Sequence, residues 1–366
     1  MIRMNFVETR VRQLADFMSH QLLWLLIGSY VLAALIPEPG LWLRSVNLAA
    51  VAGAGLPRVS VPSVLLSFLL FNAGLGVSTS RLWQLARRPT LLAVGVLANL
   101  VLPVIFILGT AATMQLWHNP REAQEILIGL ALIASMPVAG SSTAWIQNAD
   151  GDLALSIGLV VFSTCLSPLT TPLALYAVGW MAEGMYATAL HDLAAGRLSG
   201  FLGLYVLAPS LAGIAVRKAV GEERIGRFRS HLKLAGSGVL LTLCYANAAV
   251  ALPQTIRRPD WDYLAVMLVI VAVMCVGGFA AGAVIGWSAR ADQPQRASLM
   301  FGLGMTNNGT GLVIAAGALA HIPAVMLPII FYNLIQHIVA GCVDHYWLCY
   351  SVISPPKQKL RLTGEA

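Results

Sequence analysis

Two short polar stretches interrupt segments that are otherwise apolar enough to cross a membrane. The first, SMPVAGSST at residues 135–143, combines a proline, a glycine and several hydroxyl side chains. The second, GMTNNGTG at residues 304–311, combines glycines, threonines and two adjacent asparagines. Proline removes a backbone donor and obstructs the preceding helical turn, and glycine tolerates an unwound backbone. Both stretches therefore predict broken helices.

Broken helices inside a membrane create binding groups. Unpaired backbone groups persist at membrane depth only where they are buried in protein or line a wet cavity. Freed carbonyls, hydroxyls and Asn oxygens suit a cation, whereas N–H groups at helix starts favour an anion. The two stretches thus predict facing sites for a cation and an organic anion. The alternative reading is helix packing, in which small residues let helices approach and Asn, Ser and Thr hydrogen-bond across them.

Composition places these stretches in an integral membrane protein. The 366 residues are 58% hydrophobic and 11% charged, whereas a soluble domain carries about 25% charged residues. The mean hydropathy is +0.76. The five cysteines form no CxxC pair, so neither a disulfide framework nor a zinc site is expected. Residues 1–20 lack an apolar core and predict a short surface helix rather than a signal peptide.

Hydropathy predicts an all-α polytopic protein with ten transmembrane helices, since about 20 apolar residues are needed for each span. The expected spans are 21–37, 60–79, 90–112, 124–147, 153–178, 201–219, 233–252, 263–287, 297–318 and 322–350. Most of the 23 Lys and Arg residues fall on the side that holds both ends of the chain. This bias predicts the cytoplasmic membrane with both termini in the cytoplasm. It also accounts for the net charge of +7, so no nucleic-acid partner is expected.

Ten spans divide into two sets of five, and an odd number makes the second set enter the membrane in the opposite sense. The expected parts are a cytoplasmic segment 1–20, a first repeat 21–178, an extracytoplasmic linker 179–200, a second repeat 201–350 and a cytoplasmic tail 351–366. The two polar stretches fall in the fourth and ninth spans, the fourth of each repeat. Matching breaks in two inverted repeats are typical of secondary transporters with a midplane site.

At these residues the chain resembles the bile acid:sodium symporter family. The second and third spans carry GLGVS, the fourth and fifth carry PVAGSSTAWIQNADGDLALS, the ninth carries GMTNNGTG and the tenth carries NLIQH. The resemblance covers about residues 20–350. It implies a core domain and a panel domain, with broken helices 4 and 9 crossing in the core. It also implies inward transport of organic anions, usually with two sodium ions.

The resemblance assigns ion-binding positions residue by residue. Ser142 and Thr143 fall on a Ser-Asn pair, and Ser156 falls on a serine of the fifth span, but a threonine position falls on Val160. The glutamate shared by both sodium sites falls on Gly302, which predicts weak sodium binding. The other ion-binding residues implied are Asn99, Met305, Thr306 and Asn307. Asp150 and Asp152 are expected to belong to a helix N-cap rather than to replace this glutamate.

The substrate is expected on the panel side of the crossing helices. The residues assigned to it are Gly140, Ser141, Asn308, Gly309, Gln336 and His337. The predicted function is secondary transport of a small organic anion, bile-acid-like or another organic acid, by alternating access with sodium coupling. Two alternatives stay open: a proton-coupled or uncoupled carrier, in which His337 titrates, and a membrane ligand sensor that does not transport.

Enzymatic activity is not expected. The sequence contains no Walker, HExxH, GxSxG or kinase motif. No cofactor is expected, and sodium is the one ion that the resemblance implies. The expected partners are the organic anion and membrane lipid, and the sequence assigns no oligomeric state.

Overall fold

The computed structural model describes residues 2–49, 59–78, 80, 89–196 and 198–353, and these are helical almost throughout. Two basic regions counted in the charge bias are not described. Arg81, Arg87 and Arg88, which connect the second and third expected spans, lie outside the described residues, as does most of the tail 351–366.

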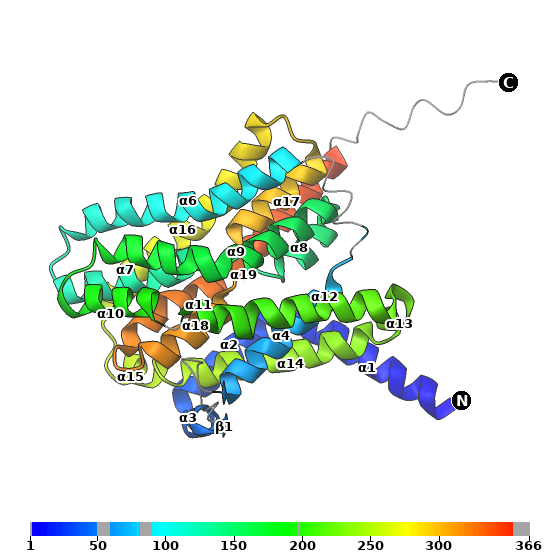
Figure 1. The fold of residues 1–366 in the computed structure, drawn as a ribbon, viewed down its shortest axis with the longest axis horizontal. Coiled ribbons are helices and arrows are strands. Elements are labelled where there is room, and N and C mark those ends of the chain that lie inside the picture. The colour runs from blue at the N-terminus through cyan, green and yellow to red at the C-terminus, as the bar shows by residue number, and fades with distance from the viewer. Residues whose placement is uncertain (1, 50–58, 79, 81–88, 197, 354–366) are drawn as a thin grey trace.

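The elements follow one another as helices joined by short connections (Figure 1). The first half contains α1 (Ile2–His20), α2 (Leu22–Leu35), α3 (Glu38–Ser45), β1 (Asn47–Ala49), β2 (Val59–Ser60), α4 (Val61–Gly76), α6 (Pro89–Met114), α7 (Pro120–Ser135), α8 (Ser142–Asn148) and α9 (Leu153–Gly179). The middle contains α10 (Gly184–Ala195), α11 (Leu198–Leu202), a π-helical turn (Gly203–Leu207), α12 (Ala208–Val220), α13 (Glu222–Arg227), α14 (Arg229–Ala248) and α15 (Leu252–Arg257). The last part contains α16 (Trp261–Ser288), α17 (Gln293–Gly304), α18 (Asn308–Ala318), a 3₁₀ turn (Pro323–Met326) and α19 (Leu327–Ile353).

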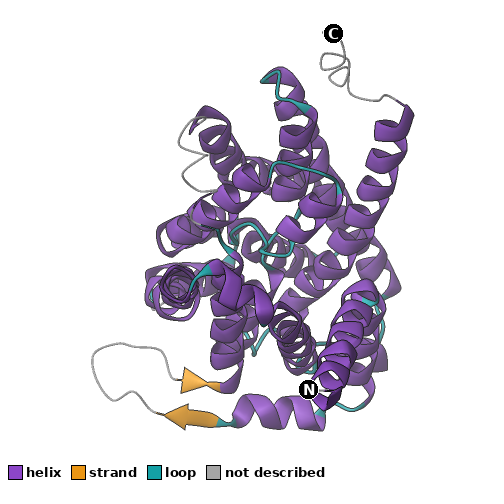
Figure 2. Ribbon diagram, turned by 90° about the vertical axis from the view of Figure 1, so that its right-hand side faces the viewer, coloured by secondary structure: helices purple, strands orange, loops and turns teal. Residues whose placement is uncertain are grey.

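The all-α prediction is confirmed, and one small β-ribbon accompanies the helices. Strands β1 and β2 pair antiparallel in a small ribbon at the periphery of the molecule (Figure 2). The ribbon joins α3 to α4. Its ladder pairs backbone groups that this non-helical connection would otherwise leave to solvent.

The helices form two layers, drawn one above the other in Figure 1. The lower layer contains α1, α2, α4, α12 and α14, and the upper layer contains α6, α7, α9, α16, α17 and α19. Small residues allow close packing within a layer. A Cβ atom on Gly74 of α4 would lie 2.2 Å from the carbonyl oxygen of Ser210 on α12, and one on Gly213 would lie 2.2 Å from that of Phe71. These glycines therefore hold α4 and α12 in backbone contact.

Helix α7 is the most enclosed part of the upper layer. Thirteen of its sixteen residues are buried, which is typical of a helix at the centre of a bundle because such a helix is covered on all sides. It contacts α6, α9, α16, α19 and the 3₁₀ turn. The helix that leads into the first break is thus anchored by its surroundings.

Side-chain caps mark where several helices begin. Asp152 is the N-cap of α9, and its carboxylate accepts hydrogen bonds from the backbone N–H groups of Ala154 and Leu155. This confirms the expected capping role for Asp152, while Asp150 lies two residues before it with a φ of 51°. Asp292 forms a capping box with Gln295 at the start of α17, and such reciprocal bonds satisfy two otherwise unpaired groups.

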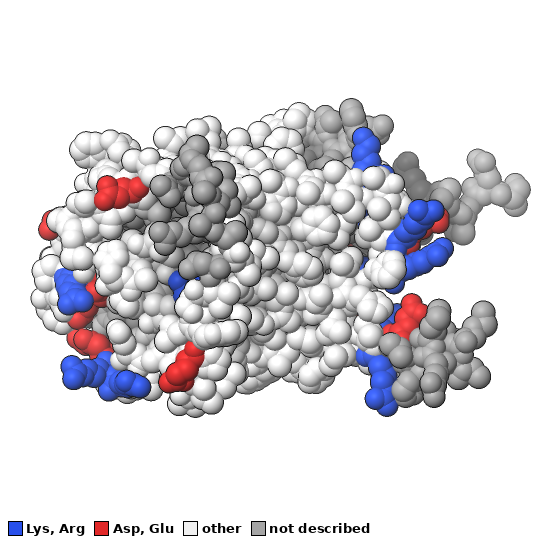
Figure 3. Space-filling model, turned by 60° about the horizontal axis from the view of Figure 1, so that its bottom comes forward, with Lys and Arg blue, Asp and Glu red and all other residues white. Residues whose placement is uncertain are grey.

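The protein is a polytopic helical membrane protein. Among the described residues, five helices are long and apolar enough to cross a bilayer, or six if the bent pair Glu8–Met18 and Leu22–Leu35 is one span. The five are Pro89–Met114, Leu153–Gly179, Leu198–Val220, Trp261–Ser288 and Pro323–Tyr346. On the face shown in Figure 3, charged side chains gather toward the two ends of the long axis and leave an uncharged band between them. A band of this kind is suited to lipid.

The other expected spans fall short of a single long apolar helix for visible reasons. Helix α4 has 16 residues and α2 has 14. The expected spans 124–147 and 297–318 are each divided into two helices. Helix α14 starts with the basic and polar residues Arg229, His231 and Lys233. The expected linker 179–200 is itself largely the helix α10.

Candidate functional site

The two polar stretches are the places where helices break. Helix α7 ends at Ser135 and α8 begins at Ser142, and α17 ends at Gly304 while α18 begins at Asn308. The two interruptions contact each other through an antiparallel bridge between Val138 and Thr306. The breaks therefore face each other, as their chemistry predicts.

Backbone groups released by each break are paired with the other break. The Ala139 N–H donates to the Met305 carbonyl at 3.0 Å, and the Asn307 N–H donates to the Pro137 carbonyl at 2.9 Å. Because buried backbone groups need partners, this pairing stabilises both interruptions at once. It also uses one lone pair of the Met305 carbonyl, which the sequence assigned to an ion.

Hydroxyl groups cluster on the first break and the start of α9. The Ser156 hydroxyl donates to the Thr143 hydroxyl at 3.0 Å, and the Ser142 hydroxyl donates to the Ala139 carbonyl at 2.7 Å. Ser142 and Ser156 are buried. The structure thus brings together the hydroxyls of Thr143 and Ser156, whereas the Ser142 hydroxyl is bonded to a carbonyl of its own break.

A second polar group lies at the other break. The Thr306 hydroxyl donates to the Asn308 side-chain oxygen at 3.2 Å, and the Asn307 side chain caps α18 by accepting from the Thr310 N–H. Asn308 and Thr310 are buried, and the Asn308 amide nitrogen and the Thr310 hydroxyl have no hydrogen-bond partner. Such unpartnered buried groups are costly, so this break holds unused hydrogen-bonding capacity.

The position assigned to the family glutamate is apolar. A Cβ atom on Gly302 would lie 2.7 Å from Cδ1 of Leu159. Leu159 belongs to a separate buried cluster that includes Val138 of the first break and Leu299 of α17, with Val160 packed against it. This apolar cluster fills the space beside Gly302. Asn99, also assigned to an ion, is buried on α6 one turn from Gly95, whose Cβ would meet the same Leu159 side chain.

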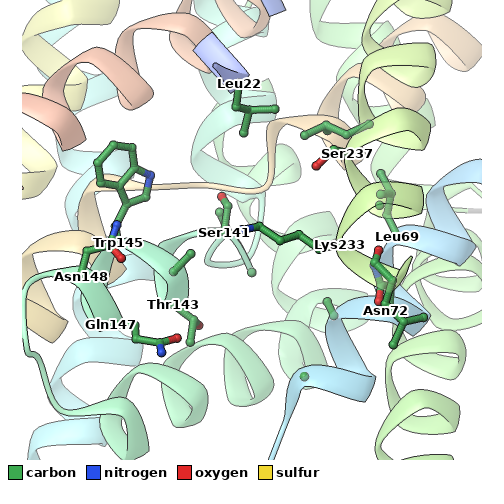
Figure 4. Close-up of a pocket in the computed structure, with 18 of the residues that line it drawn as sticks. Leu22, Leu69, Asn72, Ser141, Thr143, Trp145, Gln147, Asn148, Lys233 and Ser237 are labelled. Carbon is green, nitrogen blue, oxygen red and sulfur yellow. The ribbon is translucent and has the colours of Figure 1, made fainter. Parts of the chain in front are cut away.

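A cavity of about 2460 Å³ lies between the two layers and reaches both breaks. Every residue assigned to the substrate lines it: Gly140, Ser141, Asn308, Gly309, Gln336 and His337. Ion-binding candidates Thr143, Thr306 and Asn307 also line it, whereas Ser142, Ser156, Asn99 and Met305 do not. In Figure 4, Ser141, Thr143 and Trp145 lie on one side of the cavity and Leu69, Asn72 and Lys233 on the other. The cavity continues past α1, α13 and the start of α14 to one end of the molecule.

A chain of buried hydrogen bonds connects the second break to the lower layer. The Thr306 N–H donates to the Gln336 side-chain oxygen at 3.2 Å, and the Gln336 amide donates to the Asn333 oxygen at 3.2 Å. The Asn333 amide then donates to the Tyr30 hydroxyl of α2 at 2.8 Å. This chain runs from α19 across the layer boundary, so the break and the interface between the layers are physically linked.

Arg44 on α3 joins the layers near the end opposite the cavity mouth. Its guanidinium donates to the side-chain oxygen of Asn247 on α14 and to the Ala316 carbonyl near the C-terminal end of α18. Burial lowers the pKa of the Arg44 guanidinium, although arginine stays charged in proteins. A cation at a helix C-terminus is favourable, and here it closes the contact between α18 and α14.

Sequence reasoning missed several of these residues. Arg44 was one basic residue among others in a loop, and Lys233 was part of a positive-inside stretch. Asn333 stands in the NLIQH stretch but was assigned no role, and Tyr30 gave no signal because a single polar residue in an apolar span is equally consistent with an ordinary helix contact.

Comparisons with known proteins indicate one family. The profile of the sodium bile acid symporter family matches residues 63–257. YocS of Bacillus subtilis, named an uncharacterized sodium-dependent transporter, is 24% identical over 317 residues, covering 84% of this chain and 90% of that protein. YbaS of the same organism, named only as an uncharacterized protein, is 26% identical over 234 residues, covering 64% and 72%. The human sodium-dependent organic anion transporter is 30% identical over 120 residues, covering 33% and 30%.

Proposed function

The chain belongs to the sodium bile acid symporter family, and on this premise we propose that it transports organic anions across the cytoplasmic membrane by alternating access. One observation carries the proposal. Two broken helices pair through their backbones beside a large cavity between two helix layers. At such a break the unwound backbone lines the cavity and is not exposed to lipid, so its polar groups are available to bind a solute. The anion named for the human relative supports the substrate class.

In this mechanism the upper layer moves against the lower one. Among the described residues, those that line the cavity extend to one end of the molecule, and at the other end Arg44 joins α14 to α18. We assign the open end to the cytoplasm, because the basic α12–α14 region lies there and positive residues favour that side. The proposal includes ten spans in two inverted repeats, 21–178 and 201–350, with the linker 179–200 on the outer side.

The substrate in this proposal contacts the cavity side of both breaks. Gly140 and Ser141 contribute from the first break, and Asn308 and Gly309 from the second, where the N-terminal end of α18 favours an anion. Gln336 and His337 of α19 complete the site. Asn308 has the unpartnered amide nitrogen, which is suited to donate to a carboxylate or sulfonate oxygen.

Sodium coupling in this proposal depends on neutral oxygen atoms. The hydroxyls of Thr143 and Ser156 lie together, and the proposed ion-binding set is completed by Ser142, Thr306, Asn307, Met305 and Asn99. The two relatives named as sodium-dependent support this coupling. With a glycine at the shared acidic position, affinity for sodium is expected to be low.

A sodium-independent carrier is the second candidate. The observation that favours it is the apolar packing of Leu159 against Gly302, because apolar side chains supply no ligand for a cation. In this form the crossing helices still bind the anion, but the sodium gradient does not drive it.

Uptake into proteoliposomes tests the proposal and separates the two candidates. The probes are cholate, benzoate and succinate, each offered with an inward sodium gradient, with potassium in its place, or with a proton gradient. Accumulation of at least one probe supports anion transport. Accumulation that requires sodium supports the first candidate, and equal uptake in potassium supports the second. Binding without uptake of any probe would identify a sensor and contradict the proposal.

A further inference from the structure

The cavity contains a lysine that neither the sequence nor the proposed site uses. Lys233 lies on α14 in the lower layer, and it is the one lysine among the described residues that lines the cavity. Figure 4 shows its side chain extending from α14 toward Ser141 at the first break. The side chain thus starts from the lower layer and points into the cavity, toward the break that carries proposed substrate contacts.

The position of Lys233 is held by the neighbouring helix. Asn72 of α4 donates to the carbonyl of Leu232 at 2.9 Å. A Cβ atom on Gly236 would lie 2.6 Å from the same Asn72 amide nitrogen, so glycine is required for this close approach. Asn72 therefore fixes the turn of α14 that carries Lys233, and both residues line the cavity.

An acidic side chain of the same protein already contacts the ammonium. Asp16 on α1 lies 3.1 Å from the Lys233 nitrogen, and the two side chains are 53% and 42% exposed. Asp16 belongs to a stripe of α1 with four-residue spacing, Glu8, Arg12, Asp16 and His20, that lines the cavity. A carboxylate on a partly solvated ammonium is a weak and exchangeable contact, which a carboxylate from solution can replace.

Four arginines also line the cavity: Arg12 within α1, and Arg217, Arg227 and Arg229 at the ends of α12, α13 and α14. Arg217 pairs with Glu222 at 3.3 Å and also donates to the Leu75 carbonyl at 2.7 Å, so it is engaged in joining α12 to α4. Arg227 and Arg229 lie at the junction of α13 and α14. Lys233 is one turn further into the cavity than Arg229, and it extends toward the break.

We infer that Lys233 binds the anionic group of the transported substrate, and that Asp16 forms an ion pair with the Lys233 ammonium until the substrate displaces it. The inference rests on the proposed transport function, and it identifies Lys233 as the residue that recognises the negative charge of the substrate. Asp16 then acts as an internal competitor, and α1 loses a contact with α14 whenever the cavity is loaded.

The test compares three substitutions in the full-length protein. Binding of cholate, benzoate and succinate is measured by titration of the purified protein at low and at high salt. Lys233→Gln is expected to raise the Kd of the bound anion about five-fold or more, since it removes the charge. Asp16→Asn is expected to lower the Kd about two-fold or more because the competitor is gone. Lys233→Arg is expected to stay within about three-fold of the wild type.

The matched control is Lys218→Gln. Lys218 is exposed on α12 and does not line the cavity, so its removal changes net charge equally without affecting the Kd. Comparing the Kd at low and at high salt separates recognition of charge from a structural effect of the substitution. Added salt is expected to raise the Kd of the wild type more than that of Lys233→Gln, because salt screens the attraction between charges.

The outcomes separate the two proposals. Binding by the wild type that Lys233→Gln and Asp16→Asn leave unchanged would overturn the role of Lys233 and leave the transport function intact. A wild-type protein that neither binds nor accumulates any of the three probes overturns the proposed function, and the inference falls with it. Opposite changes in Kd for the two variants, with no change for Lys218→Gln, support the inference.

Discussion

At the scale of single residues, Gly302 and Leu159 define how this chain differs from the pattern that its family resemblance implies. Leu159 is fully buried and occupies the space next to Gly302 and Gly95. The Leu159 side chain is fully buried and packs directly against both glycines, so little free space is available for it to move aside. Restoring a carboxylate at position 302 would therefore require Leu159 to be repacked as well, because Leu159 occupies the space that the larger side chain needs.

Gly302→Ala tests this packing. The added Cβ lies 2.7 Å from Leu159 Cδ1, and overpacking of this kind costs about 1–3 kcal/mol, which exceeds the gain of about 1 kcal/mol from replacing a helical glycine. We therefore expect a lower melting temperature. Gly277→Ala is the control, because no atom lies within 4 Å of its added Cβ, and it is expected to stabilise. A Gly302→Ala protein that melts at or above the wild-type temperature would contradict the packing.

Gln336 offers a second test at this scale, because its side-chain oxygen is the partner of the Thr306 N–H. Gln336→Leu leaves that buried donor unpaired, at a cost of about 1–3 kcal/mol. Ile338→Leu, at an exposed position of the same helix, is the control. In detergent, chemical unfolding should show a clear loss of stability for Gln336→Leu and little change for Ile338→Leu. A Gln336→Leu protein as stable as the wild type would mean that the bond to Thr306 contributes little.

At the scale of elements, the two breaks were predictable and their mutual pairing was not. Pro137 with Gly140, and the three glycines from Gly304 to Gly311, are local signals that any reader of the sequence can recognise. The bonds from Ala139 to Met305 and from Asn307 to Pro137 join residues far apart in the chain. Periodicity carries no information on such contacts, so a sequence cannot say how many freed carbonyls remain for an ion.

The contact of Arg44 belongs to this scale because it joins α3, α14 and α18. Opening the cavity at this end requires α18 to separate from α14, and charge-assisted hydrogen bonds oppose that separation. Arg44→Gln is expected to raise amide hydrogen exchange about ten-fold near residues 246–250 and 314–318. Arg257→Gln on α15 is the control, since Arg257 is exposed. Unchanged exchange in both segments would show that Arg44 does not hold this end closed.

At the scale of the whole molecule, composition was sufficient to predict a helical membrane protein, but it was insufficient to predict the number of long apolar helices. The uncharged band between two charged ends follows directly from the low charge content (Figure 3). Helix α14 shows the limit, because Arg229 and Lys233 lower its hydropathy while the same residues line the cavity. The cavity itself lies between the two layers, and contacts between residues far apart in the chain, such as the bond from Asn333 of α19 to Tyr30 of α2, are not revealed by any local pattern.

Sodium affects the whole molecule through binding to the folded state. A ligand at ten times its Kd stabilises by about 1.4 kcal/mol. The melting temperature is therefore expected to rise in sodium relative to potassium and choline at equal ionic strength, and Thr143→Val is expected to reduce the rise. Identical melting in the three salts at high concentration would contradict sodium coupling and favour the sodium-independent carrier.

The most direct test of the account is anion uptake through the cavity beside the two breaks. Gly309 lines that cavity, and its added Cβ would make only an ordinary contact, 3.6 Å from the Asn307 oxygen. Proteoliposomes are prepared with the wild type, with Gly309→Leu and with Gly277→Leu, whose position on α16 is exposed. The account predicts uptake by the wild type and by Gly277→Leu, and loss of uptake with Gly309→Leu at an unchanged melting temperature. Uptake by Gly309→Leu at the wild-type rate would contradict the assignment of this cavity as the transport path.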